Sequence, residues 1–223
     1  MNRSFAIAVA VAAATLTSAA DEASKFHFID LKPYVNQKRG DSFGVDAENN
    51  LGKLPGGEQT FGGIRMSIDP AIIQLGSSVL DTLPGKVEGI KVDRTFSKLH
   101  ILHATQFGGG PNREGSPWFV KDGTLIGEYR INFEDKSSLT IPIVYGQDVR
   151  DWFYAEGEAT TARAQVVWNE ENVYAASVGA KIRLYLTTWD NPNPEKKVVS
   201  IDYLGKKDET VAAPFCVALS AEE

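Results

Sequence analysis

The sequence predicts an all-β fold, an antiparallel β-sandwich of the jelly-roll type. Helical periodicity is hard to find after the first twenty residues, and short runs rich in β-branched and aromatic residues recur between Gly, Pro, Asn and Asp. Several runs alternate polar and apolar residues, which is typical of antiparallel strands with one face in the core. In Leu125–Phe133, for example, the apolar residues at positions 129, 131 and 133 alternate with polar ones.

Ten strands are expected along the chain, with no helix between them. They are Lys25–Leu31, Gly63–Ile68, Val87–Val92, Lys98–Thr105, Leu125–Phe133, Leu139–Tyr145, Arg163–Trp168, Lys181–Thr188, Val198–Tyr203 and Phe215–Leu219. Asp122-Gly123 is expected to close one hairpin, and the FEDKSS segment before Leu139 a second. Strands without intervening helices pack as two sheets, which gives the sandwich.

Residues 1–20 have the features of a secretory signal peptide. Arg3 supplies a positive charge, Phe5–Leu16 is an apolar run interrupted only by Thr15, and small residues at 17–20 offer a cleavage site after Ala20 or one residue earlier. The run is short for a membrane span, so an uncleaved anchor is the minor alternative. We therefore expect a secreted or periplasmic protein with a single sandwich domain at 21–223 and no membrane insertion after cleavage.

The charge and cysteine content of the mature chain restrict its partners. Loss of Arg3 with the signal leaves 22 of the 23 basic residues against 29 acidic ones, a net charge of −7. An acidic protein is a poor partner for nucleic acid and for anionic membranes, whereas neutral sugars remain compatible. Cys216 is the sole cysteine, so no internal disulfide forms and stability rests on packing, with or without a metal.

The segment QKRGDSFGVDAENN, residues 37–50, contains three well-known strings. Arg39-Gly40-Asp41 matches a cell-adhesion tripeptide, and residues 40–44 match both the start of GDS hydrolases and the G-x-S-x-G nucleophile elbow. An elbow needs a strand before Ser42 and a helix after it, whereas the flanking residues are those of a loop. We interpret all three matches as coincidence in a loop.

The same loop is the best metal candidate in the sequence. Asp46, Glu48 and Asn50 alternate, Asp41 precedes them, and hard oxygen ligands on a glycine-bearing loop suit Ca²⁺. The spacing is not that of an EF-hand, and a solvated loop without metal is the alternative. His100 and His103 lie three apart on an expected strand and so face opposite ways; we expect one in the core or at its rim and the other at the surface.

Aromatic residues beside polar ones are the remaining functional signal. Trp152 follows Arg150 and Asp151, and Trp189 lies at a strand end before a Pro-rich loop. An indole can stack on the apolar face of a sugar while polar neighbours bind its hydroxyls. The alternative is that these tryptophans fill the core.

The order of these segments resembles the galactose-binding-like jelly-roll modules (NPCBM-like) of secreted bacterial glycoside hydrolases. The resemblance rests on FIDLKPYVNQ, NNLGKLPGGEQTFGGIRMSI, VEGIKVDRTFSKLHILHAT, GEYRINFEDKSSLTIPIVYGQDVRDWF, ARAQVVW and IRLYLTTWDNPNPEKKVVSIDY, which span most of Lys25–Ala218. It implies carbohydrate binding through loops at one end or on a concave face, and in many members a structural calcium. Ligand residues vary among these modules, so the resemblance assigns no site.

These observations favour a secreted, non-catalytic carbohydrate-binding sandwich. The candidate glycan contacts are Arg150, Asp151, Trp152 and Trp189; no catalytic residue and no catalytic cofactor is expected, and a glycan or polysaccharide is the expected partner. An extracellular or envelope protein-interaction domain is the first alternative. A jelly-roll glycoside hydrolase is the second, although the E-x-D-x-x-E pattern of jelly-roll glucanases is absent.

Overall fold

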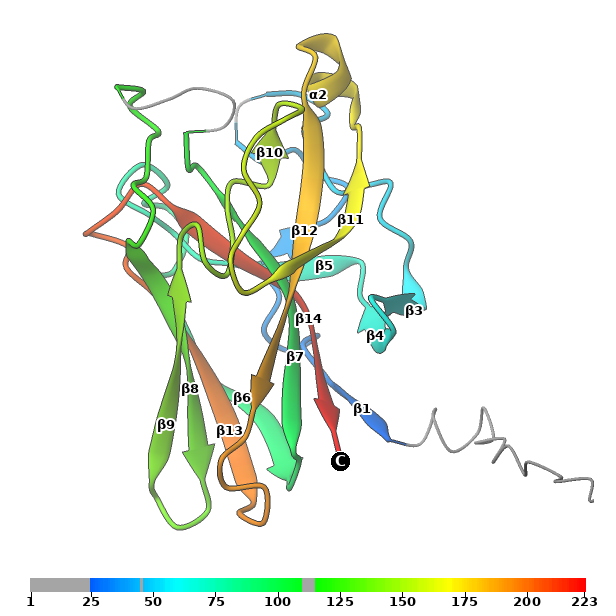
Figure 1. Cartoon of the computed structure of the whole chain (residues 1–223), viewed down its shortest axis with the longest axis vertical. Helices are drawn as coiled ribbons and strands as arrows, with labels where there is room; N and C mark the ends of the chain where they lie inside the picture. Colours follow the sequence, from blue (N-terminus) through cyan, green and yellow to red (C-terminus); the bar gives the residue numbers. More distant parts are fainter. Residues whose placement is uncertain (1–24, 45, 110–114) are drawn as a thin grey trace, which may run out of the picture.

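The structure, a computed structural model, describes residues 25–44, 46–109 and 115–223 (Figure 1). Nearly all of its regular structure is strand, arranged in two packed sheets and a small hairpin. Every pair of named strands in these ranges is antiparallel. The predicted all-β antiparallel sandwich is therefore confirmed. The signal segment 1–20 lies outside the described residues, and no helix among those described is long and apolar enough to cross a membrane.

The larger sheet has eight strands. Its main path runs β10 (Phe153–Tyr154), β12 (Lys181–Asp190), β7 (Lys98–Gln106), β14 (Ala213–Glu222), β5 (Ala71–Gln74) and β2 (Gln37–Lys38). Strand β1 (Phe26–Ile29) pairs with β14, and β11 (Gln165–Glu170) pairs with β12. The long strands β7 and β14 thus lie side by side in the middle of this sheet.

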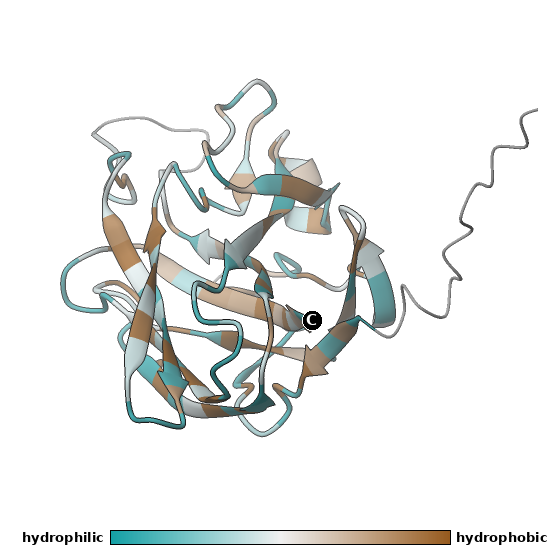
Figure 2. Ribbon diagram, turned by 60° about the horizontal axis from the view of Figure 1, so that its bottom comes forward, coloured by the Kyte–Doolittle hydropathy of each residue, from teal (hydrophilic) through white to brown (hydrophobic). Residues whose placement is uncertain are grey.

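The smaller sheet has the order β6 (Lys86–Arg94), β13 (Val198–Gly205), β8 (Leu125–Phe133) and β9 (Ser138–Val144). In β8 the alternating residues Tyr129, Ile131 and Phe133 are buried, as their spacing predicts. The Tyr129 ring stacks on Tyr203 with centroids 4.6 Å apart and lies against His103 of the larger sheet. Figure 2 shows hydrophobic segments along the strands of both sheets. Buried residues from the two sheets form one hydrophobic core.

A third layer covers the outer face of the larger sheet. Strands β3 (Gly57–Phe61) and β4 (Ile64–Ile68) form a hairpin, and β4 packs against β14 and β1. Strand β7 is buried on both faces, and both His100 and His103 are at most 2% exposed. His100 lies against Phe26 of β1 and Glu222 of β14, and His103 lies against Tyr129 of the smaller sheet. The prediction that one of them lies at the surface is wrong, because the sequence of β7 does not reveal that both of its faces are covered.

The only helix among the described residues, α2 (Val173–Ser177), is fixed to the loop that follows β2. Its N-cap residue Asn172 accepts a hydrogen bond from the Ala175 amide through Oδ1 (2.7 Å), which satisfies one of the free donors of the first turn. The side-chain Nδ2 of Asn172 donates to Asn49 Oδ1 (2.8 Å) and to the Asn50 carbonyl (3.1 Å). Helix α2 and residues 49–50 are therefore held together, although they are far apart in the sequence.

Each of the ten expected strands corresponds to an observed one, with ends shifted by a few residues. Strands β2, β3, β5 and β10 were not predicted. The FEDKSS hairpin is confirmed as the β8–β9 connection. The hairpin expected at Asp122-Gly123 is wrong, because a turn is present there but residues 118–120 form no strand. These residues instead form a loop beside the pocket described next.

Candidate functional site

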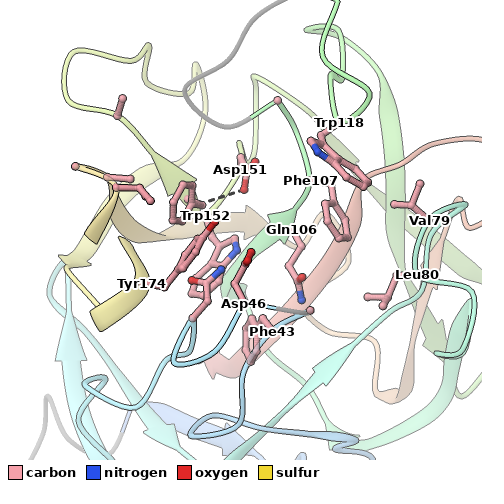
Figure 3. A pocket seen from close by; sticks show the side chains of 18 residues that line it. Phe43, Asp46, Val79, Leu80, Gln106, Phe107, Trp118, Asp151, Trp152 and Tyr174 are labelled. Atoms are coloured by element: carbon pink, nitrogen blue, oxygen red, sulfur yellow. Dashed lines mark hydrogen bonds between the residues drawn. The ribbon is translucent and has the colours of Figure 1, made fainter. Parts of the chain in front are cut away.

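A pocket of about 590 Å³ opens at the end of the sandwich that carries β10 and α2 (Figure 3). Residues from five segments distant in sequence line it: Phe43, Gly44, Asp46 and Asn49 after β2; Val79 and Leu80 after β5; Gln106, Phe107 and Gly109 at the end of β7; Asp151, Trp152, Phe153 and Ala155 around β10; and Tyr174, Val178, Gly179 and Ala180 in and after α2. Trp118 completes the wall. Binding pockets for small molecules are usually concave, largely apolar and of this size, so the pocket is the candidate site.

One wall of the pocket is a pair of stacked aromatic rings. The centroids of Phe107 and Trp118 are 5.2 Å apart with the planes at 27°, and Trp118 is 44% exposed. Phe107 has a φ of 57°, which is rare for a bulky residue and marks local strain. Gly108 follows, where a Cβ would lie only 2.4 Å from the Tyr145 hydroxyl oxygen. The close approach of this loop to Tyr145 thus requires a glycine and fixes the position of Phe107.

The opposite wall and floor come from β10 and the loop after β2. Trp152 is only 2% exposed, and its ring packs against Phe43 (4.9 Å between centroids) and Phe215 (6.0 Å). Asp151 is 5% exposed, and its Oδ1 accepts a hydrogen bond from the Phe153 amide at 3.1 Å. Trp152 is therefore mainly a core residue that forms the pocket floor, and Asp151 is a buried carboxylate in the wall.

A partly buried ion pair lies behind Asp151 and contacts its backbone. Arg183 of β12 is 2% exposed; its Nε donates to the Asp151 carbonyl (3.1 Å) and its Nη2 to the Glu158 carboxylate (2.6 Å). Its guanidinium also lies 4.2 Å from the ring centroid of Tyr154. Desolvation raises the pKa of Glu158, and the charge of Arg183 opposes that shift. The pair connects β12 to β10 and holds the Asp151 backbone in place.

The other two predicted glycan contacts do not line this pocket. Arg150 makes a bidentate ion pair with Asp122 (2.9 and 2.6 Å) and donates to the Thr160 carbonyl. Trp189 is half-buried against the core at the far end of β12. It lies eight positions after Lys181 along the strand, which is roughly 26 Å at about 3.3 Å per residue. The structure therefore brings Asp151 and Trp152 together and leaves Arg150 and Trp189 elsewhere.

The four predicted calcium ligands have different surroundings in the structure. Asp46 lines the pocket, whereas Asp41 and Glu48 are exposed. Asn50 Oδ1 accepts a hydrogen bond from the Gly52 amide (2.9 Å). Within the described residues no group of three or more His, Cys, Asp or Glu is placed to hold a metal. Calcium binding by these residues stays a prediction, which unfolding with and without EDTA would test.

The loop strings of the sequence have structural roles. Arg39 donates from Nε to the Asp69 carbonyl and from Nη1 to the Leu54 carbonyl, so its guanidinium holds the loop. The Ser42 hydroxyl accepts a hydrogen bond from the Glu48 amide at 2.8 Å. The histidines that could serve as its base are engaged elsewhere: His100 with Thr188 and Glu222, and His103 with Thr187. This arrangement supports the interpretation of residues 37–50 as a structural loop.

Three pocket residues were missed as site residues by the sequence analysis: Phe107, Trp118 and Tyr174. The only sequence signals were an aromatic residue before Gly108 at a strand end and Trp118 in a Gly-rich stretch. Tyr174 is half-buried, and its pKa is raised by desolvation and by the neighbouring Asp46 carboxylate. The contact of Tyr174 with Asp46 joins segments far apart in sequence, and the Phe107–Trp118 stack lies within an irregular loop, so no spacing rule predicts either.

Comparison with protein families and with curated proteins assigns no function to the pocket. No protein-family model matches the chain, and no curated protein matches it. The resemblance to galactose-binding-like modules therefore stays an expectation from the sequence, and the function is inferred from the residues of the pocket.

Proposed function

We propose that this chain is a secreted, non-catalytic carbohydrate-binding sandwich that takes a sugar unit of a glycan in the Trp118 pocket. The observation that carries the proposal is the pairing of an exposed aromatic ring with carboxylates across one pocket. Trp118 offers an indole backed by Phe107, and Asp46 and Asp151 lie among the other lining residues (Figure 3). A sugar needs both surfaces, because its ring faces are apolar and its edges carry hydroxyl groups.

The rigidity of the site favours binding. Trp152, Phe43 and Phe215 fill the floor, and the Asn172 hydrogen bonds hold α2 against the loop that carries Asp46. A preformed pocket loses little conformational entropy on binding, so more of the contact energy contributes to affinity. The apolar run after Arg3 supports export, which would expose the protein to extracellular or cell-wall glycans.

A protein partner is the second candidate, because the pocket mouth is unusually apolar. Val79, Trp118 and Val178 all line the pocket and are 42–56% exposed. Exposed apolar side chains gathered at one place are typical of protein-interaction sites. Pull-down from the native secretome separates the candidates: a stable protein partner whose binding needs Trp118, with no glycan bound, would favour this second one.

The direct test is calorimetric titration with soluble oligosaccharides, using Trp118→Ala and a matched control, Phe119→Ala. Phe119 neighbours Trp118 and is 37% exposed, yet it does not line the pocket. We expect Trp118→Ala to weaken binding about tenfold or more, since stacking of an aromatic ring contributes about 1 kcal/mol beyond its buried area. Phe119→Ala should bind like the wild type. Equal losses in both variants, or none in either, would contradict the proposal.

The same titration addresses the hydrolase alternative. Two carboxylates in one pocket are also the arrangement of acid–base glycosidases. We expect the oligosaccharides to be recovered intact after long incubation. Release of reducing ends that stops in Asp151→Asn would replace the binding proposal with a hydrolase.

A further inference from the structure

Two buried amide side chains of the pocket each have one hydrogen-bonding atom without a partner. Asn49 is 8% exposed and Gln106 is 5% exposed, and both line the pocket. Among the described residues, no group bonds to Asn49 Nδ2 or to Gln106 Oε1. Buried polar atoms of a folded protein nearly always have a partner, so a free pair in one pocket indicates a ligand that bonds to them.

The bonds at the other atom of each amide fix which atom is free. Asn172 Nδ2 donates to Asn49 Oδ1 (2.8 Å), and the Asn172 Oδ1 caps α2, so the free atom of Asn49 is its nitrogen. Gln106 Nε2 donates to Gln74 Oε1 (3.0 Å), while Gln74 Nε2 donates to two backbone carbonyls at 2.9 Å. Neither amide can turn over without losing a bond. The pocket therefore presents one fixed N–H donor and one fixed carbonyl acceptor.

Both free atoms are accessible from the pocket. Among the described residues, fully enclosed side-chain polar atoms without a partner occur only in Tyr185, Tyr203 and Ser220. The free atoms of Asn49 and Gln106 are not of that kind, so each keeps some open surface. Because both side chains are otherwise buried and line the pocket, that surface faces the ligand space.

An aromatic floor connects the two amides. The Phe43 amide donates to the Asn49 carbonyl (2.7 Å), and the Phe43 ring packs on Trp152 (4.9 Å between centroids). The Trp152 amide in turn donates to the carbonyl of Thr105, which precedes Gln106 (2.9 Å). Figure 3 shows Phe43, Trp152 and Gln106 at the base of the pocket. A group that bonds to both amides therefore lies against ring surface.

We infer that the bound sugar carries an N-acetyl group, and that Asn49 and Gln106 recognise it. A secondary amide has one carbonyl acceptor and one N–H donor, which complement the two free atoms. Asn49 Nδ2 donates to the acetyl carbonyl, and the acetamido N–H donates to Gln106 Oε1. The methyl group then covers apolar surface of the floor. The inference rests on the proposed carbohydrate-binding function and names the class of sugar.

Sugars without the acetyl group fit these atoms less well. A hydroxyl group can bond to either amide, but it supplies no apolar group for the aromatic floor, and a polar group left there without a partner is destabilising. A free amine is protonated at neutral pH and offers only donors, so it cannot accept a hydrogen bond from Asn49 Nδ2. Both kinds of sugar therefore serve as comparison ligands.

Sugars that differ only at carbon 2 test the inference. One series consists of the β-1,4-linked trisaccharides of N-acetylglucosamine, glucosamine and glucose, and a second of the methyl glycosides of N-acetylgalactosamine and galactose. The mature protein is titrated with each by calorimetry at neutral pH. In at least one series we expect the acetylated sugar to bind about tenfold more tightly than its partners, because each new hydrogen bond adds a modest net gain. An unacetylated sugar that binds as tightly would overturn the inference.

Two matched variants test the role of Asn49. Asn49→Asp removes the free donor but keeps an oxygen for the hydrogen bond from Asn172. The control Asn50→Asp adds the same charge to the same loop, keeps an oxygen for the Gly52 amide and does not line the pocket. We expect Asn49→Asp to lose the preference for the acetylated sugar and Asn50→Asp to keep it, at a temperature where both are folded. Equal losses in both variants would show a general charge effect and overturn the inference.

The outcomes separate the inference from the proposed function. If glucose or galactose sugars bind as well as the acetylated ones, sugar binding stands and the N-acetyl inference fails. If the acetylated sugar is preferred and Asn49→Asp keeps the full preference, recognition by Asn49 is wrong. If no acetylated sugar binds but an unacetylated polysaccharide raises the melting temperature, the proposed function survives alone. If no sugar of any kind binds, both the inference and the proposed function fail.

Discussion

Two tryptophan substitutions test how the structure divides the aromatic residues between core and site. Trp152 is 2% exposed between Phe43 and Phe215, so Trp152→Ala leaves a cavity in the core. Replacement of a buried Trp by Ala costs about 3–5 kcal/mol. In a chain of this size each kcal/mol lowers the melting temperature by about 2–4 °C, which predicts a loss of about 6–20 °C. Trp118→Ala removes a 44% exposed ring and one stack on Phe107, for which we expect about 1–2 kcal/mol.

Scanning calorimetry or urea unfolding of the two variants measures these differences directly. Binding to the best oligosaccharide is then compared at a temperature where both variants are folded. We expect Trp152→Ala to lower the melting temperature by about 6–20 °C, and Trp118→Ala to lower it by only about 2–8 °C while binding is lost. A melting temperature within about 2 °C of the wild type for Trp152→Ala would refute the assignment of Trp152 to the core.

Three further predictions follow from the packing. Gly108→Ala should lower the free energy of unfolding by about 1–3 kcal/mol, because the new Cβ would lie 2.4 Å from the buried Tyr145 hydroxyl oxygen. The control Gly40→Ala, whose Cβ would have no atom within 4 Å, should leave the free energy of unfolding nearly unchanged in the same urea titration. Equal losses in the two variants would contradict this prediction. Burial lowers the pKa of His103 to about 3, below the ordinary value of about 6.5, so the unfolded state binds the extra proton between these values. Stability should therefore be fully present above pH 6.5 and fall as the pH drops, by about 2 kcal/mol at pH 5 from this group. The variant His103→Gln should lose less free energy of unfolding than the wild type between pH 7.5 and pH 5. A pH dependence equal to that of the wild type would refute the role of His103. Trp189→Ala should leave oligosaccharide affinity unchanged, since Trp189 lies at the opposite end of β12 from the pocket; a tenfold loss in calorimetric titration would restore it to the site.

The sequence predicts the strands whose burial alternates. In β8 a polar face and an apolar face are visible in the residue order, and buried and less buried residues alternate along the strand accordingly. Strand β7 hides its environment, because a run such as LHILHAT is compatible with one or two covered faces. The short strands β2 and β10 have two residues each and are defined only by partners distant in the chain, β5 and β12. Local periodicity does not reveal which distant segment a short strand pairs with.

The same limit applies to the site. Asp151 and Trp152 could be selected from the sequence because an acid beside an aromatic after a turn is a typical binding pattern. The burial of Trp152 depends on Phe43 and Phe215, which come from opposite ends of the chain. Trp118 stacks on Phe107, eleven positions before it, and no spacing rule for strands or helices predicts that contact. Asp46 was chosen as a calcium ligand from the oxygen-rich loop, whereas its place in the fold is the pocket wall.

Thermal unfolding of the mature protein across a panel of plant, algal and microbial polysaccharides tests the central claim most directly. A ligand that binds only the folded state stabilises it by about 2.7 kcal/mol at a hundred times its dissociation constant. We predict a glycan-specific rise in melting temperature for the wild type and for Phe119→Ala, and no rise for Trp118→Ala. A rise that persists in Trp118→Ala, or no rise with any polysaccharide, would contradict a carbohydrate site in the Trp118 pocket.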